Sequence, residues 1–78
     1  MPDILHVEIG QRISKRRYEH NLTMEALAGK TEPTMSPKYL WEVENGRKRL
    51  SAQMLRRIAI ALGVSTDWIL GLTEDKER

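Results

Sequence analysis

Two short runs of basic side chains are the residues of this sequence best suited to bind an anion. Lys15-Arg16-Arg17 and Arg47-Lys48-Arg49 each place three cations in succession, and such groups bind phosphate oxygens through charge-assisted hydrogen bonds. Lys and Arg total 13 against 11 Asp and Glu, so the net charge of +2 does not by itself indicate a nucleic-acid partner. Either run alone is typical of a solvated surface, and only its place in a fold can give it a binding role.

Residue types that support catalysis or bind metals are scarce. The chain has no cysteine, which excludes disulfides, Cys-ligated zinc and a thiol nucleophile. His6 and His20 are isolated and lack metal-ligand spacing, and no Ser/His/Asp set, carboxylate pair or glycine-rich phosphate loop is recognisable. We therefore expect no catalytic residue, no metal site, no small-molecule cofactor and no enzymatic activity.

Length and hydropathy limit the architecture further. At 78 residues the chain has room for one small domain. The longest apolar stretch, Ile58 to Val64, falls far short of the ~18 residues that span a bilayer. We expect a protein that avoids membranes and works in the cytoplasm.

The first two elements follow from helical periodicity. Leu5, Ile9 and Ile13 recur every four residues and would share one face of a first helix, which Asn21 can close in a left-handed conformation. Thr23 is a suitable N-cap for a short second helix that ends near Lys30.

Three more helices are predicted after Pro33, which prevents simple continuation of the second. Ser36-Pro37 is a strong start signal for a third helix, in which Leu40, Val43 and Glu44 share a face before the stop at Gly46. Ser51 caps a fourth helix with an inward stripe, and its apolar end, including Ile60 and Ala61, should be buried nearly all round before Gly63. The stripe comprises Leu55, Ile58, Ala59 and Leu62.

A short fifth helix would open at Ser65 or Thr66 and end at Gly71. Alternating strand patterns are absent. The prediction is an all-α fold of five helices, with one domain over residues 1–73 and a solvated, charged tail over residues 74–78.

Four segments carry a more specific pattern. They are Ile9-Gly10-Gln11-Arg12-Ile13, Leu22-Thr23-Met24-Glu25-Ala26-Leu27-Ala28, Tyr39-Leu40-Trp41-Glu42-Val43-Glu44-Asn45-Gly46-Arg47 and Ile58-Ala59-Ile60-Ala61-Leu62-Gly63-Val64-Ser65. In this order and at nearly the family spacing, they resemble the Cro/cI (XRE-type) DNA-binding domain over about residues 9–72. The resemblance implies a compact lambda-repressor-like domain with a helix-turn-helix at about 23–45 and a recognition helix at about 36–45.

The resemblance also implies roles for individual residues in a DNA complex. Base edges in the major groove would face Pro37, Lys38 and Glu42, with Tyr39 beside them; Lys can reach guanine and Glu can accept from cytosine. Phosphates would be bound by Thr23, Met24, Ser36, Arg47, Lys48, Arg49, Arg12 and Arg16. For Arg12 and Arg16 a solvated surface role is equally consistent, and Met24 stands where the family commonly has a Gln that clamps phosphate.

Arg17 and Glu44 are expected to form a pair. Arg17 continues the Ile9–Ile13 stripe by four residues and Glu44 continues Leu40 by four, so both charges should point inward. An inward charge needs a partner, and the resembling family often has a salt bridge at these positions.

Two features leave alternatives open. The segment from Leu22 to Gly46 is two residues longer than usual for the family, around Glu32-Pro33, so Thr34, Met35 or Ser36 would either approach DNA or bulge into solvent. Trp68, Ile69 and Leu72 either cap the core or contact a second subunit, and Trp41 either packs on the flank or meets a partner.

Together these expectations describe a sequence-specific, double-stranded DNA-binding transcriptional regulator. It would act as a repressor and bind its operator as a homodimer, because two-fold symmetry doubles the contacts to a palindromic site. The alternative is an antitoxin-like or adaptor module of the same fold that binds a regulatory protein partner, with weak or secondary DNA binding. Met24 and Glu42, both poor partners for phosphate, favour that alternative.

Overall fold

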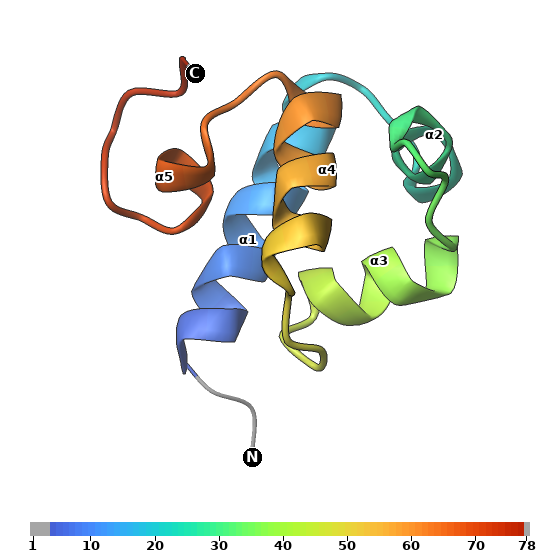
Figure 1. Ribbon diagram of the computed structural model, residues 1–78, viewed down its shortest axis with the longest axis horizontal. Coiled ribbons are helices and arrows are strands. Elements are labelled where there is room, and N and C mark those ends of the chain that lie inside the picture. Colours follow the sequence, from blue (N-terminus) through green and yellow to red (C-terminus); the bar gives the residue numbers. More distant parts are fainter. Residues whose placement is uncertain (1–3, 78) are drawn as a thin grey trace.

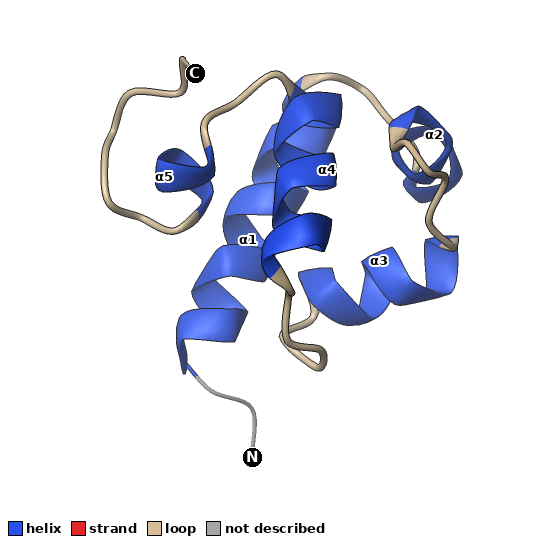
Figure 2. Cartoon of the chain, viewed as in Figure 1, coloured by secondary structure: helices blue, strands red, loops and turns tan. Residues whose placement is uncertain are grey.

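The computed structural model describes residues 4–77, and within that range the regular secondary structure is entirely α-helical (Figures 1 and 2). The helices are α1 (Ile4–Glu19), α2 (Met24–Lys30), α3 (Pro37–Glu44), α4 (Ala52–Leu62) and α5 (Thr66–Ile69). The predicted all-α, five-helix architecture is confirmed over the described range. Residues 1–3 of the predicted domain and residue 78 of the predicted tail lie outside that range.

The helices are arranged around a central pair. Figure 1 shows α1 and α4 crossing the middle of the molecule, with α2 and α3 on one side and α5 on the other. The tail folds back beside α5. The helix-turn-helix segment and α5 therefore occupy opposite sides of the domain.

The predicted start signals position the helices. Each of four capping side chains accepts a hydrogen bond from the backbone N–H three residues later, satisfying a donor that the first helical turn cannot use. The pairs are Thr23 with Ala26, Ser36 with Tyr39, Ser51 with Met54, and Ser65 with Trp68. Asn21 closes the first helix with a positive φ of 55°, as predicted.

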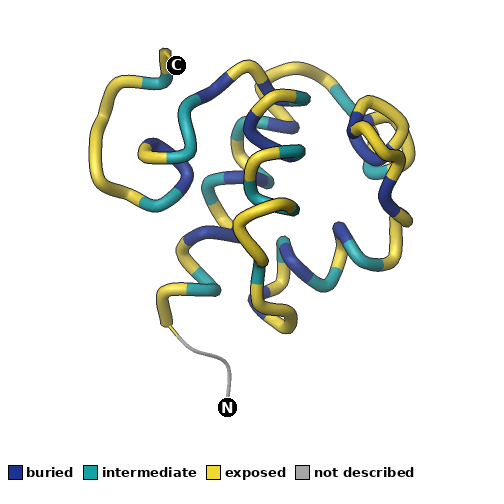
Figure 3. Tube along the Cα trace, viewed as in Figure 1, coloured by how far each residue is buried: buried dark blue, intermediate teal, exposed yellow. Residues whose placement is uncertain are grey.

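The core consists of apolar side chains contributed by all five helices. Buried stretches alternate with exposed ones along the helices in Figure 3. The large, fully buried aliphatic side chains are Ile13, Leu27, Leu40, Ile58, Leu62, Ile69, Val43 and Val64.

Gly10 allows α1 and α3 to approach closely. A Cβ atom at this position would lie 2.5 Å from the carbonyl oxygens of both Val43 and Glu44, well inside van der Waals contact. Only a residue without a side chain lets the end of α3 pack this tightly on α1.

Two predictions of burial were wrong. Leu5 is 46% exposed because the first turn of α1 extends beyond the body of the domain (Figure 1). The buried stripe begins at Ile9. Ile60 is 47% exposed because it lies ~200° around α4 from Ile58, the core-facing residue two positions earlier.

The longer loop between α2 and α3 is anchored to the core. Thr31 is buried, and its hydroxyl donates to the carbonyl oxygen of Ala28 at 2.6 Å and accepts from the backbone N–H of Met35 at 2.9 Å. Met35 is buried as well, which removes it as a DNA contact. The extra residues, around the cis Glu32–Pro33 peptide, protrude into solvent.

The tail is docked, in contrast to the prediction that it is simply solvated. The carbonyl oxygen of Lys76 accepts from the backbone N–H of Ser65 at 2.8 Å. The Lys76 ammonium lies 3.5 Å from Glu19 Oε1 and 5.5 Å from the centroid of a Trp68 ring. These contacts attach the tail to α1 and to the start of α5.

Candidate nucleic-acid interface

Helix α3 has one side committed to the core and one side open to solvent. Leu40 and Val43 are buried, while Pro37 and Lys38 are exposed and Glu42 is half-buried. At 100° per residue, Lys38 and Glu42 lie on the side of the helix opposite the buried pair. The structure thus brings Lys38 and Glu42 to the side of α3 away from the core, and Pro37 is exposed at the start of the helix.

Tyr39, the fourth, lies elsewhere. Its side chain is half-buried and packs against the core cluster, and that burial raises the pKa of its phenol above the ordinary value. Tyr39 follows Lys38 by one residue, so it lies 100° further around α3, toward the side that holds Leu40 and Val43. We therefore correct its expected place beside the base-reading residues.

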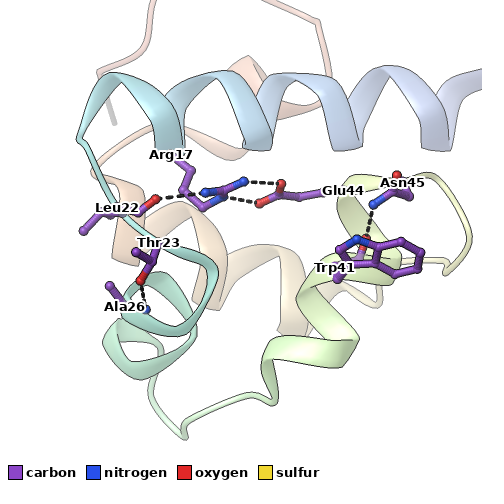
Figure 4. Close-up of polar contacts among 7 residues, drawn as sticks. All are labelled: Arg17, Leu22, Thr23, Ala26, Trp41, Glu44 and Asn45. Atoms are coloured by element: carbon purple, nitrogen blue, oxygen red, sulfur yellow. Dashed lines mark hydrogen bonds and ion pairs between the residues drawn. The ribbon is translucent and has the colours of Figure 1, made fainter.

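Arg17 and Glu44 join α1 to the end of α3 through a two-pronged contact (Figure 4). Arg17 Nε donates to Glu44 Oε2 at 2.7 Å, and Arg17 Nη2 donates to Glu44 Oε1 at 3.0 Å. Arg17 Nη1 also donates to the carbonyl oxygen of Leu22 at 2.9 Å, just before α2. One guanidinium therefore ties together the chain before α2, the end of α3 and its own helix.

This pair is shielded from solvent. The exposed fractions of the two side chains are 7% for Arg17 and 5% for Glu44. The hydrogen bonding that Arg17 donates to the Glu44 carboxylate raises the pKa of the Arg17 guanidinium, against the opposing effect of burial. The contact holds α3 in a defined orientation with Lys38 and Glu42 outward.

The loop after α3 carries three exposed cations. Arg47, Lys48 and Arg49 are all exposed. The loop that holds them adjoins the C-terminal end of α3 (Figure 1). The guanidinium carbon of Arg47 lies 5.5 Å from the centroid of a Trp41 ring.

The expected phosphate contacts on the helix-turn-helix lie at helix starts. Thr23 and Ser36 are exposed capping residues of α2 and α3, and each hydroxyl oxygen is already an acceptor for a backbone N–H. Met24, the first residue of α2, packs partly against the core. The hydroxyl hydrogens of both caps still have donor capacity for a phosphate.

Arg12 and Arg16 are directed away from this surface. A Cβ atom at Gly71, beyond α5, would lie 2.7 Å from Arg12 Nη2, and Arg16 Nη1 lies 3.3 Å from Glu19 Oε1. Arg12 therefore lies against the chain after α5, and Arg16 pairs within α1 with Glu19, which also meets Lys76 of the tail at 3.5 Å. We correct their expected place among the phosphate contacts, because on α1 Arg12 lies ~160° and Arg16 ~120° around the helix from Gly10, which faces α3.

Of the expected dimer residues, only Leu72 is available to a partner. Trp68 is 7% exposed and Ile69 is fully buried, whereas Leu72 is 73% exposed. The first two belong to the core of the chain itself, because α5 is so short that its apolar face is needed to cover α1 and α4.

The charges are distributed unevenly along the fold. Residues 33–57, which include α3 and the loop after it, carry six Lys and Arg against two Glu, one of which is Glu44 in its ion pair. Residues 58–77, on the α5 side, carry four Asp and Glu against one Lys. Residues 33–57 are thus a more positive segment of the chain than residues 58–77.

Sequence reasoning missed the contacts of three residues that shape this surface, although it expected Trp41 either to pack on the flank or to meet a partner. Gly10 allows the close contact with α3, Thr31 anchors the longer loop, and Trp41 contacts Arg47. Only Trp41, a large aromatic residue on an otherwise polar side of a short helix, had a visible signal. In the described part of the chain, no group of three or more His, Cys, Asp or Glu residues could hold a metal ion. None of the described helices is long and apolar enough to cross a membrane.

Comparisons with known proteins agree with this geometry. Residues 13–69 match the family model for a helix-turn-helix. A crystal structure of the clp gene regulator ClgR from Corynebacterium glutamicum is 30% identical, with a TM-score of 0.81 over 92% of this chain and 90% of that chain. A second structure of the same regulator gives 0.80 at 30% identity, over 92% of this chain and 74% of that one.

A third match is a restriction-modification controller protein, C.AhdI from Aeromonas hydrophila. It is 26% identical, with a TM-score of 0.77 over 82% of this chain and 94% of that chain. No curated protein sequence matches significantly. The family and these structural neighbours are regulators and not enzymes. The chain belongs to the XRE-type helix-turn-helix family of DNA-binding transcriptional regulators, which bind double-stranded DNA.

Proposed function

We propose that this protein recognises a specific operator by inserting α3 into the major groove of DNA. The observation that carries the proposal is the division of α3 into a locked side and an open side. Leu40, Val43 and the Arg17–Glu44 pair hold the helix on the domain, while the exposed Lys38 and the half-buried Glu42 lie on the side away from the core. The major groove admits one α-helix and presents donors and acceptors on its base edges.

In this proposal Lys38 and Glu42 read bases, and Pro37 contacts an apolar group such as a thymine methyl. Lys38 donates to the O6 and N7 atoms of guanine, and Glu42 accepts from the amino group of cytosine. A carboxylate near phosphates is otherwise repelled, so Glu42 gives discrimination rather than general affinity.

Phosphate binding is assigned to the loop after α3 and to the helix caps. Arg47, Lys48 and Arg49 supply the charge, and the hydroxyls of Thr23 and Ser36 supply hydrogen bonds, with Met24 contributing its backbone N–H. The excess of cations over residues 33–57 supports this assignment, because phosphate contacts supply most of the salt-dependent affinity for DNA.

We further infer that the protein is a cytoplasmic repressor that acts as a homodimer. Two copies related by a two-fold axis would place two α3 helices in successive major grooves, ~34 Å apart. The exposed Leu72 supports a dimer contact beyond α5. The structural neighbours are described as a clp gene regulator and a restriction-modification controller protein, both regulators of gene expression.

Selection from a randomised DNA duplex pool at two salt concentrations tests the proposal. The expected result is an enriched motif with two-fold symmetry whose half-sites are about one helical turn apart. Retention of DNA without any enriched motif, disappearing as salt rises, would show non-specific attraction only. That result would contradict the proposal and favour the antitoxin-like or adaptor function.

A further inference from the structure

Trp41 is an exposed aromatic side chain at the border of the open side of α3. The residue is 45% exposed, and Figure 4 shows its ring projecting from the helix. Trp41 follows Lys38 by three residues and precedes Asn45 by four, so it is a neighbour of both on the helix surface. The ring therefore adjoins the surface proposed to enter the major groove, and it contributes little to the core.

The cation against this ring comes from the loop after α3. The guanidinium carbon of Arg47 lies 5.5 Å from the ring centroid, within the ~6 Å over which a cation and an aromatic face attract. Arg47 itself is exposed. Without such a contact, a side chain of this length would sample many rotamers in solvent.

The backbone beneath Arg47 is held in a regular helix-ending geometry. The backbone N–H of Arg47 donates to the carbonyl oxygen of Glu42 at 2.8 Å, and that of Gly46 donates to Val43 at 3.1 Å. Gly46 has a φ of 70°, so these two bonds form a Schellman motif. The same motif commonly brings the side chain after the glycine back onto the last turn, where Trp41 lies.

We propose that Trp41 is a positioning residue for DNA binding, whose ring pre-orients the Arg47 guanidinium toward a DNA phosphate. An arginine that stacks through its planar face keeps its N–H edges free, and those edges bind phosphate in a two-pronged manner. Ordering the side chain before binding lowers the entropy lost on complex formation. The inference rests on the proposed function and adds a residue that does not itself read bases.

A double-mutant cycle measures this coupling. Trp41→Ala, Arg47→Ala and the double variant are compared with the wild type by fluorescence anisotropy, using a labelled random duplex at several salt concentrations. We expect Trp41→Ala to weaken binding about two- to five-fold, the equivalent of one exposed cation–π contact. In the Arg47→Ala background the same change should have no further effect, and Trp41→Phe should retain most of the affinity.

A second measurement reports the contact without DNA. The Nε–H proton resonance of Arg47 should carry a ring-current shift in the wild type that Trp41→Ala abolishes. Urea unfolding midpoints of the variants should match the wild type, since neither side chain is in the core.

Three results would overturn the inference. The first is an unchanged DNA affinity of Trp41→Ala. The second is an equal loss of affinity from Trp41→Ala in the wild-type and Arg47→Ala backgrounds, which would mean that the ring contacts DNA itself. The third is an Arg47 Nε–H resonance without a ring-current shift in the wild type. Absence of DNA binding by the wild type would instead contradict the proposed function, so the two failures are distinguishable.

Discussion

Replacing Glu44 with alanine should destabilise the domain severely. The change leaves the Arg17 guanidinium, 7% exposed, without the two carboxylate bonds at 2.7 and 3.0 Å. Its remaining acceptor is the carbonyl oxygen of Leu22, and its remaining favourable neighbour is the Tyr18 ring, 4.4 Å away. An uncompensated buried charge of this kind costs about 3–5 kcal/mol.

That loss is large relative to the whole stability of the protein. At ordinary values per residue, a 78-residue domain has a free energy of unfolding of about 4–12 kcal/mol. For a domain of this size each kcal/mol corresponds to roughly 4–8 °C in melting temperature, so Glu44→Ala should melt at least about 12 °C lower. Urea denaturation followed by circular dichroism at 222 nm measures the loss directly.

Two further variants separate a buried charge from a general effect on α3. Glu42→Ala removes the same group from the open side of the same helix and should change the unfolding free energy by no more than about 0.5 kcal/mol. The double change Arg17→Met with Glu44→Leu removes both charges and should recover at least half of the loss, because apolar pairs often replace buried ion pairs well. A loss below about 1 kcal/mol in Glu44→Ala, or no recovery in the double variant, would refute the reasoning.

Four other expectations can be checked with single substitutions. Gly10→Ala should cost about 1–3 kcal/mol in urea unfolding, since its Cβ would overlap two carbonyl oxygens, whereas Gly29→Ala, with open space around it, should be neutral or stabilising. Lys38→Ala should weaken binding to the selected operator more than binding to random duplex. An equal loss of affinity for both DNAs would indicate that Lys38 contacts a phosphate instead of a base. Arg47→Ala should weaken both about equally and reduce the slope of log affinity against log salt by roughly one, and an unchanged slope would remove it from the phosphate contacts. Burial raises the pKa of Tyr39, so its stabilising contribution should be complete below the unfolded value of about 10 and be lost as pH rises through the folded pKa. Alkaline unfolding of Tyr39→Phe should lack this component, and identical pH profiles would contradict it.

Much of the fold was predictable because its signals are local. The helix boundaries are set by residues within one helical turn of each end, so they can be predicted from neighbouring residues in the sequence. These residues are the serine and threonine caps, Pro37 and the residues with positive φ. The predicted burial of Leu5 and Ile60 was wrong. An apolar residue of a helix is buried only where another element covers it, and the helical pattern does not show which element covers which residue.

The candidate site divides in the same way. Lys38, Glu42 and the cations of 47–49 were predicted to face DNA from the family resemblance and from their places near helix ends. Their DNA roles stay predictions; Lys38 and the three cations are exposed, and Glu42 is half-buried. The side chains of Arg12, Arg16 and Tyr39 are equally able to hydrogen-bond to DNA. Whether a helix presents such a side chain to DNA depends on how that helix packs on the rest of the domain. Their angular positions around α1 and α3 place these three away from the open side of α3.

The sequence by itself therefore determined five helices, their caps, the family and the inward positions of Arg17 and Glu44, since these depend on spacing along one chain. Only the tertiary structure decided which cations share a surface with α3, that Gly10 admits the end of α3, and that Trp41 contacts Arg47. It also decided that Trp68 and Ile69 complete the core and that the tail docks on α1 and α5. The physical reason is that a contact between distant segments depends on the distance and angle between helices, which arise from the packing of all their side chains together.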